Sequence, residues 1–239
     1  MGGIVGYLGN REARQILIEC LGRLDERGYD SAGMGTVAGG KLKTLHSLGN
    51  STDLAGIKAT LKRSPLGGKV GVVHVYRSGR GQVYNAHLHN DGNFLAIVHD
   101  GSRDNDHAVA RLLERDGISL EALLPEAVAL LKGDFSLVGL SQKEPDRIIT
   151  ARRGSRPLYI AQYYDGYFVT SDLPAISHFA RSYQILEDGE KAIVSYTGVA
   201  ISKFDGSPVQ RALTQLHSHA SQHEAPYELP AFMARSVPG

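Results

Sequence analysis

Short apolar runs separated by turns dominate the hydrophobic pattern, and the first of them begins almost at the N-terminus. Asn10 can cap a helix whose apolar positions from Ala13 to Leu24 fall on one face, and Gly28 is a plausible stop for it. The Gly39-Gly40 pair between two extended runs is typical of a hairpin. For the first hundred residues the pattern therefore predicts, in order, a strand at 3–7, a helix, a hairpin reaching Leu48, a short helix over 51–63, a strand over 69–75, a polar loop and a strand over 93–99.

The second half of the chain is richer in strands. Two helices, over about 106–115 and 120–131, come before four short extended runs at 135–140, 147–151, 158–162 and 167–170. Turns separate these runs, which favours an antiparallel meander. We expect a brief helix from Asp172 to Ala180, then a hairpin over 191–204, and after Thr214 a tail that loses periodicity.

Composition indicates a soluble, cytoplasmic protein. The 239 residues are 42% hydrophobic, enough for a full core and, in our interpretation, one large domain. Lysine and arginine number 26 against 25 acidic residues, so bulk charge predicts no nucleic-acid partner. The sequence shows no charged-then-apolar leader and no run of 18 apolar residues, so we predict no membrane partner.

Neither the cysteine, nor a group of histidines, nor any glycine-rich loop predicts a further site. Cys20, the single cysteine, lies on the apolar stripe of the first helix, so we interpret it as a small core residue rather than a replacement nucleophile. His217, His219 and His223 have a spacing that could touch one metal, but they lie in the tail without a Cys or carboxylate frame, and we reject a metal site. No Gly-rich phosphate loop follows a strand, so no cofactor is predicted.

Five motifs then occur in an order that resembles one family. They are Gly3-Ile4-Val5-Gly6-Tyr7, Arg27-Gly28-Tyr29-Asp30-Ser31-Ala32-Gly33, Asn85-Ala86-His87-Leu88-His89, Val98-His99-Asp100-Gly101 and Leu186-Glu187-Asp188-Gly189-Glu190. On these residues the chain resembles the glutaminase domain of glucosamine-6-phosphate synthase, a class II glutamine amidotransferase. The resemblance covers most of residues 2 to 204.

The resemblance implies an α+β fold, a four-layer αββα sandwich of the N-terminal-nucleophile hydrolase type. It also implies a chemistry in which an N-terminal cysteine attacks the carboxamide of glutamine and releases ammonia through a thioester. Gly2 occupies the position of that cysteine and carries no nucleophile. Whether Met1 is removed decides if an α-amino group is exposed there.

Three further positions depart from what the resemblance implies. The family continues the strand that carries His74 with Thr-Arg-Trp-Ala-Thr-His-Gly, whose Arg binds the glutamine α-carboxylate; here Tyr76 takes the Arg position, and Arg77 could replace it only through a one-residue slip. Arg80 takes the position of the second His of that motif. Asp100 replaces the Asn donor of the oxyanion hole, whereas Gly101 is retained. The Thr-Asp-Thr-Glu motif, whose Asp holds the substrate ammonium, has no counterpart between Gly117 and Leu131.

Some family residues are kept, and two interpretations of them stay open. Arg27 either lies near the nucleophile position or holds its turn in a fixed geometry. Asn85 and His87 are either scaffold residues, which we favour, or ligand contacts. Their retention argues for the fold more than for activity.

Two functional hypotheses follow from different classes. In the first, residues 1–213 form a glutaminase-like pseudo-enzyme that binds a small molecule in the former glutamine pocket or regulates a partner. In the second, the remodelled pocket with Tyr76, Arg77, Arg80 and Asp100 acts on a different, anionic substrate, with Asp100 as general base. Residues 214–239 resemble the connector to a sugar-isomerase domain, which the sequence lacks, and we expect a partner protein there.

Overall fold

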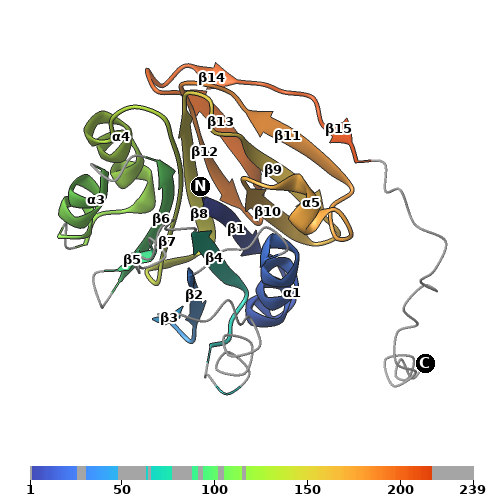
Figure 1. Cartoon of the computed structure of the whole chain (residues 1–239). Coiled ribbons are helices and arrows are strands. Elements are labelled where there is room, and N and C mark those ends of the chain that lie inside the picture. Colours follow the sequence, from blue (N-terminus) through green and yellow to red (C-terminus); the bar gives the residue numbers. More distant parts are fainter. Residues whose placement is uncertain are drawn as a thin grey trace, which may run out of the picture.

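Two face-to-face β-sheets form the centre of the molecule, and helices cover their outer faces (Figure 1). The computed structural model describes residues 2–25, 31–47, 63, 66–76, 88–90, 94–101, 105–114 and 117–216. All strand pairings in these residues are antiparallel. The predicted helix over 51–63, apart from Arg63, which is helical, and the tail after 216 lie outside the described residues, as do residues 27–30 of the Arg27 motif.

The first sheet has eight strands and contains the N-terminal strand at its middle. Its order is β15 (Thr214–Gln215), β11 (Ser182–Leu186), β9 (Leu158–Tyr163), β10 (Gly166–Thr170), β1 (Gly2–Leu8), β4 (Val70–Tyr76), β2 (Ser31–Ala38) and β3 (Lys41–Ser47). The predicted hairpin is confirmed, since β2 and β3 pair through the Gly39-Gly40 turn, where both glycines have positive φ.

The second sheet has seven strands. Its order is β14 (Pro208–Val209), β13 (Gly198–Lys203), β12 (Glu190–Ser195), β8 (Glu144–Arg153), β7 (Phe135–Ser141), β6 (Leu95–Gly101) and β5 (Leu88–Asn90). The predicted strand near Asn93–His99 is thus present, but it extends through Asp100 and Gly101, so both of these residues lie in the sheet.

Four described helices form the outer layers. They are α1 (Ala13–Asp25), α3 (Asn105–Leu113), α4 (Leu120–Leu130) and α5 (Leu173–Ile176). The predicted helix to Ala180 is shorter than expected, since regular helix ends at Ile176 and residues 177–179 continue as turns. Figure 1 shows α1 and α5 on one side of the sandwich and α3 and α4 on the other.

Three separate apolar clusters confirm the four-layer αββα sandwich. One lies between α1 and the first sheet and includes Leu17 and Val5. A second lies between the sheets and includes Ile4 and Val98, and a third joins the second sheet to α3 and α4. Neighbouring residues such as Ile4 and Val5 point into different clusters because side chains alternate along a strand. Both faces of β1 are therefore buried.

The expected meander over the strands from 135 to 170 is wrong at its centre. β7 and β8 pair, and β9 and β10 pair, but the turn between Arg153 and Leu158 carries the chain from the second sheet to the first. The apolar pattern does not reveal this crossing, because strands of both sheets are buried and have similar composition. The crossing turn matters for the site described below.

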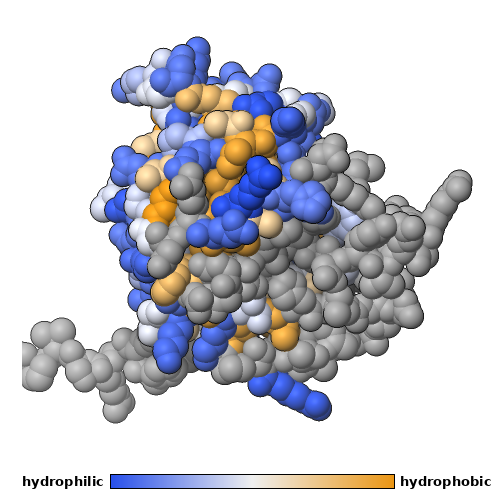
Figure 2. All heavy atoms as spheres, turned by 90° about the vertical axis from the view of Figure 1, so that its left-hand side faces the viewer, coloured by the Kyte–Doolittle hydropathy of each residue, from blue (hydrophilic) through white to orange (hydrophobic). Residues whose placement is uncertain are grey.

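The face of the molecule that bears α3 and α4 mixes hydrophilic and hydrophobic residues (Figure 2). On α4 the buried side faces the second sheet, while Ala122, Ala129 and Leu130 are among the exposed positions. No helix in the described part of the chain is long and apolar enough to cross a membrane. The domain boundary after residue 213 stays a prediction; Thr214 and Gln215, just beyond it, pair with β11.

Candidate functional site

The candidate site lies where the beginning of β1 meets the end of β6. Gly2 pairs with Tyr76 across β1 and β4, and its backbone N–H donates a hydrogen bond to Asp100 Oδ1 at 3.2 Å. The two-residue period of the strands explains this meeting. Ile4 and Val98 lie between the sheets, so Gly2 and Asp100, each two residues away, project into the same layer. The fold thus brings together residues 98 positions apart.

The space beside Gly2 is already filled. A Cβ added to Gly2 would lie 2.7 Å from His74 Nε2, 3.0 Å from the Val75 carbonyl oxygen and 3.4 Å from Asp100 Oδ1. His74 is fully buried, so its ring has little room to yield. A side chain at position 2 therefore requires the neighbouring groups to move.

Asp100 is held by an arginine that the sequence analysis did not single out. Arg156 Nη1 lies 2.6 Å from Asp100 Oδ2, and the Asp100 side chain is 10% exposed, against 29% for Arg156. A carboxylate this buried needs a partner, and the guanidinium supplies a charge-assisted hydrogen bond. The two carboxylate oxygens are therefore engaged by different groups, one by Gly2 and one by Arg156.

The turn that carries Arg156 is the one that crosses between the sheets, and carboxylates hold it at several points. Asp134 Oδ2 accepts hydrogen bonds from the Ser155 backbone N–H at 3.1 Å and from its hydroxyl at 2.5 Å. These bonds lower the pKa of Asp134. Asp188 Oδ1 accepts from the Gly154 N–H at 2.6 Å. Asp188 belongs to the fifth motif found in the sequence, so that motif helps to position Arg156.

One local feature of the sequence indicates that Arg156 is presented by a tight turn. Gly154 has a φ of +77°, and a Cβ there would lie 2.0 Å from Asp134 Oδ1. A Gly-Ser-Arg-Pro run between two strands therefore marks a tight turn that presents an arginine. What the sequence could not show is that the turn points back to Asp100.

The structure also describes Gly101 and Tyr76, two other residues that the sequence predicted to belong to the site. Gly101 continues β6 opposite Phe135, and a Cβ there would come within 2.9 Å of the Asp134 carbonyl oxygen, so the position is closely packed. Tyr76 ends β4, is partly buried and has its ring centroid 6.5 Å from that of His74. Gly2, Tyr76 and Asp100 are thus brought to one place, whereas Arg27, Arg77, Arg80 and His87 lie outside the described residues.

The buried groups close by do not form a metal centre. His99 points to the opposite face of β6, where its Nε2 lies 3.0 Å from Asp106 Oδ1 of α3. Within the described ranges, no three His, Cys, Asp or Glu side chains converge to hold a metal ion. Cys20 is fully buried in the α1 cluster, and burial raises the pKa of its thiol, as expected for a core residue.

Sequence comparison finds relatives that cover nearly the whole chain. Three of them carry the name glutamine–fructose-6-phosphate aminotransferase (isomerizing). The Clostridium acetobutylicum protein is 29% identical over 248 residues, covering 94% of this chain and 40% of the relative. The Symbiobacterium thermophilum protein is 33% identical with the same coverages, and the Rhizobium meliloti protein is 33% identical over 88% of the chain and 38% of the relative. A scan against family models finds no match.

Structural comparison gives the same fold. A glutamine phosphoribosylpyrophosphate amidotransferase from B. subtilis, complexed with ADP and GMP, superposes with a TM-score of 0.67 at 24% identity, covering 84% of this chain and 49% of that one. A structure described as the allosteric regulatory enzyme of purine biosynthesis superposes with a TM-score of 0.69 and the same identity and coverages. At this identity the match concerns the fold.

The two sheets with their outer helices have the N-terminal-nucleophile hydrolase fold. The relatives of 30% identity or more, which match nearly the whole chain, show that it belongs to the class II glutamine amidotransferase family. Its relatives identify it further as similar to the glutaminase domain of glucosamine-6-phosphate synthase, which confirms the resemblance found in the sequence. The chain spans about 40% of the length of these relatives.

Proposed function

We propose that this domain has lost glutamine hydrolysis and works as a binding or partner-regulating module. The observation that carries the proposal is the arrangement at Gly2. The residue has no nucleophilic side chain, and its N–H is bonded to a carboxylate that is itself paired with Arg156. Acyl transfer needs a nucleophile and hydrogen-bond donors for the developing oxyanion. Here an acceptor stands where the donor amide of the family is expected.

The electrostatics of Asp100 support the same proposal. An anionic carboxylate near a developing oxyanion raises the energy of the transition state, and loss of one donor alone costs roughly 100- to 1,000-fold in rate. Arg156 offsets the charge of Asp100 but occupies one of its oxygens at 2.6 Å. Asp100 thus contributes to holding the N-terminal strand in place and supplies no donor for catalysis.

The alternative, an enzyme of changed chemistry, needs Asp100 as a general base. A base must come within hydrogen-bond reach of the proton that it removes, and Asp100 is held by Gly2 and Arg156 with its side chain only 10% exposed, which leaves a substrate little access to it. This geometry favours the pseudo-enzyme. The tail from residue 214 is our proposed place for a partner protein, and a small molecule in the former glutamine pocket is the proposed ligand.

Ammonia release from glutamine tests the proposal directly. The purified chain is assayed beside the homologous Clostridium acetobutylicum enzyme as a positive control. We expect no ammonia above background and no thioester in intact-protein mass spectra. Glutamine turnover, or a covalent glutamyl adduct, would refute the proposal.

Ligand-induced thermal shifts separate the two hypotheses. A ligand that binds the native state alone raises its melting temperature. Glutamine, glutamate and other organic anions are screened against the wild type and against Arg77→Ala and Arg80→Ala. Stabilisation by an anion that these variants lose, together with turnover of that anion, would favour the enzyme of changed chemistry. Stabilisation without turnover would support a binding module.

A further inference from the structure

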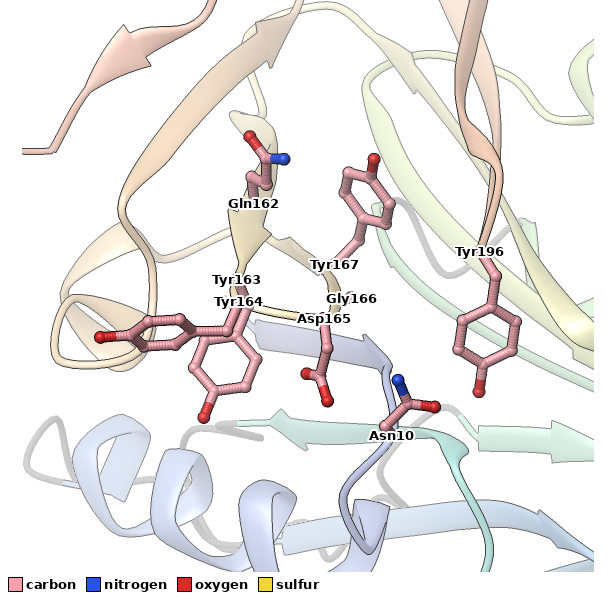
Figure 3. Close-up of a pocket in the computed structure, with 8 residues that line it drawn as sticks. All are labelled: Asn10, Gln162, Tyr163, Tyr164, Asp165, Gly166, Tyr167 and Tyr196. Atoms are coloured by element: carbon pink, nitrogen blue, oxygen red, sulfur yellow. The ribbon is translucent and has the colours of Figure 1, made fainter. Parts of the chain in front are cut away.

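A hollow lies at the opposite end of β1 from Gly2 (Figure 3). It has a volume of about 480 Å³, within the usual range for sites that bind small ligands. The β9–β10 turn, Asn10 just after β1, and Tyr196 between β12 and β13 line it, so both sheets contribute. Four of its lining residues are tyrosines, at positions 163, 164, 167 and 196.

This hollow is separate from the site at Gly2. β1 runs for seven residues from Gly2 to Leu8, and Asn10 follows that strand's far end. At about 3.3 Å per residue, the two sites are roughly 20 Å apart. Nothing in the proposed loss of glutaminase chemistry explains a cluster of tyrosines there.

One acidic side chain lines the hollow. Asp165 is the charged residue that lines it, and within the described part of the chain its carboxylate makes no hydrogen bond or ion pair. The pKa of Tyr196 is raised, first by burial and then by the carboxylates of Asp165 and Asp146. Asp146 does not line the hollow and is paired with Arg147, so Asp165 is the charge that favours a positively charged occupant.

The aromatic walls are held in place by contacts outside the hollow. The Tyr196 hydroxyl donates to the Gly9 carbonyl oxygen at 3.0 Å, and Arg11 Nη1 donates to the Tyr163 hydroxyl at 2.9 Å. The guanidinium of Arg181 lies 3.6 Å from the ring centroid of Tyr164, so one ring of this group already binds a cation on its face. Tyr163, Tyr164 and Tyr196 are therefore each held by a contact that needs no ligand.

Figure 3 shows Tyr167, Tyr196, Asn10 and Asp165 arranged around a common open space. We propose that this space binds an organic cation, an ammonium or guanidinium group, with Asp165 as its counter-ion. Tyr167 and Tyr196 are the aromatic side chains available to the cation in this space, and the Asn10 amide oxygen can accept a hydrogen bond from one of its N–H groups. Such a cation is supplied either by a small free amine or by a lysine or arginine side chain of another protein.

Titration calorimetry with butylammonium and butylguanidinium tests the proposal on the full chain at constant ionic strength. Butanol, of similar shape and without charge, is the control ligand. We expect saturable binding of both cations, and binding about tenfold weaker in Asp165→Asn, since one charge-assisted contact is lost. Asp205→Asn, which removes an exposed turn carboxylate on the second sheet, is the matched control and should bind as the wild type does.

The aromatic contribution is tested by a pair of variants. Tyr196→Phe keeps the ring and loses its hydrogen bond to Gly9, so cation binding should persist; Tyr196→Leu loses the π face and should bind several-fold more weakly. A short peptide with a central lysine, compared with its acetyl-lysine form, tells the two sources apart. Tighter binding of the peptide than of the free amine points to a protein partner.

Three results would overturn the proposal. They are failure of either cation to bind the wild type at millimolar concentration, equal binding by Asp165→Asn, and binding of butanol or another neutral polar ligand as tight as that of the cations. Each can be read with circular dichroism as a check that the variants fold. None depends on glutaminase activity, so this result and that of the ammonia assay are independent.

Discussion

Arg156, in the turn between the sheets, pairs with Asp100 at the end of β6, with 2.6 Å between Nη1 and Oδ2. The other oxygen of Asp100 accepts a hydrogen bond from the Gly2 backbone N–H. The three groups form a chain of contacts that joins the sheet-crossing turn, the second sheet and the N-terminal strand. The position that the resemblance aligns with the nucleophile is thus tied to the packing of the sandwich.

Restoring the missing cysteine should not restore activity. In Gly2→Cys the new Cβ meets His74 and Val75, and the carboxylate of Asp100 still faces the site. We expect no ammonia release from glutamine and a loss of stability of about 1–3 kcal/mol from overpacking. Gly2→Ala is the matched control, since it adds the same Cβ without a thiol and should lose a similar amount. Substantial glutaminase activity in Gly2→Cys would contradict this expectation.

The contribution of the Asp100–Arg156 pair can be measured by a double-mutant cycle. Asp100→Asn and Arg156→Gln should each lower the free energy of unfolding by about 1.5–3 kcal/mol, because each leaves a partly buried charge without its partner. The double variant should lose less than the sum of the two, since no charge is then left unpaired. Urea unfolding gives all four values. Strict additivity would mean that the pair contributes nothing.

Arg211 should hold the segment after β14 to the body of the domain. Its two terminal nitrogens each lie 2.9 Å from a different carboxylate oxygen of Glu190, whose side chain is 4% exposed. Arg211→Gln leaves that carboxylate buried without a cation and should cost about 3 kcal/mol. Hydrogen exchange should become faster at Thr214 and Gln215, which pair with β11.

Arg147 provides the control for that experiment. Its contacts with Glu144 and Asp146 are longer, at 3.6 and 3.7 Å, and more exposed. Arg147→Gln should therefore cost less than about 1 kcal/mol. Equal losses in the two variants would show that burial of Glu190 does not decide the strength of its pair with Arg211.

His178 should make the protein less stable in mild acid. Burial, and then the charge of Arg23, lowers its pKa from 6.5 to about 4, although Glu19 lies 3.8 Å away and acts in the opposite direction. Burial prevails because the Glu19 side chain is 53% exposed and screened by water. As the pH falls from 6.5 towards 4, the unfolded state takes up a proton that the folded state does not, so stability declines.

The expected loss in this pH range is on the order of 1–2 kcal/mol, reduced by partial solvation of the ring. Urea unfolding at pH 7 and pH 5 measures it, with His178→Gln as the comparison. The variant should show a smaller decline between the two pH values. Equal declines in the two proteins would assign the acid sensitivity to other groups.

The sequence by itself determined much about the fold. β1 and β4 are buried on both faces, so their sequences are near-continuous apolar runs. The Gly39-Gly40 pair predicted the hairpin, and the apolar stripe of the first helix placed Cys20 in the core. These features are local, because each depends on residue types at short spacing. The chemistry of Gly2 and Asp100 was also local, since a missing nucleophile and a carboxylate in place of an amide are properties of single residues.

Only the tertiary structure decided which residues meet. Asp100 contacts Gly2 across 98 positions and Arg156 across 56, and the tyrosines of the hollow come from strand ends and turns of two different sheets. The crossing from β8 to β9 makes the contact with Arg156 possible, and a meander within one sheet would not. Strand order and register set these contacts, and because strands buried in either sheet share the same apolar pattern, the sequence alone does not encode them in any local signal.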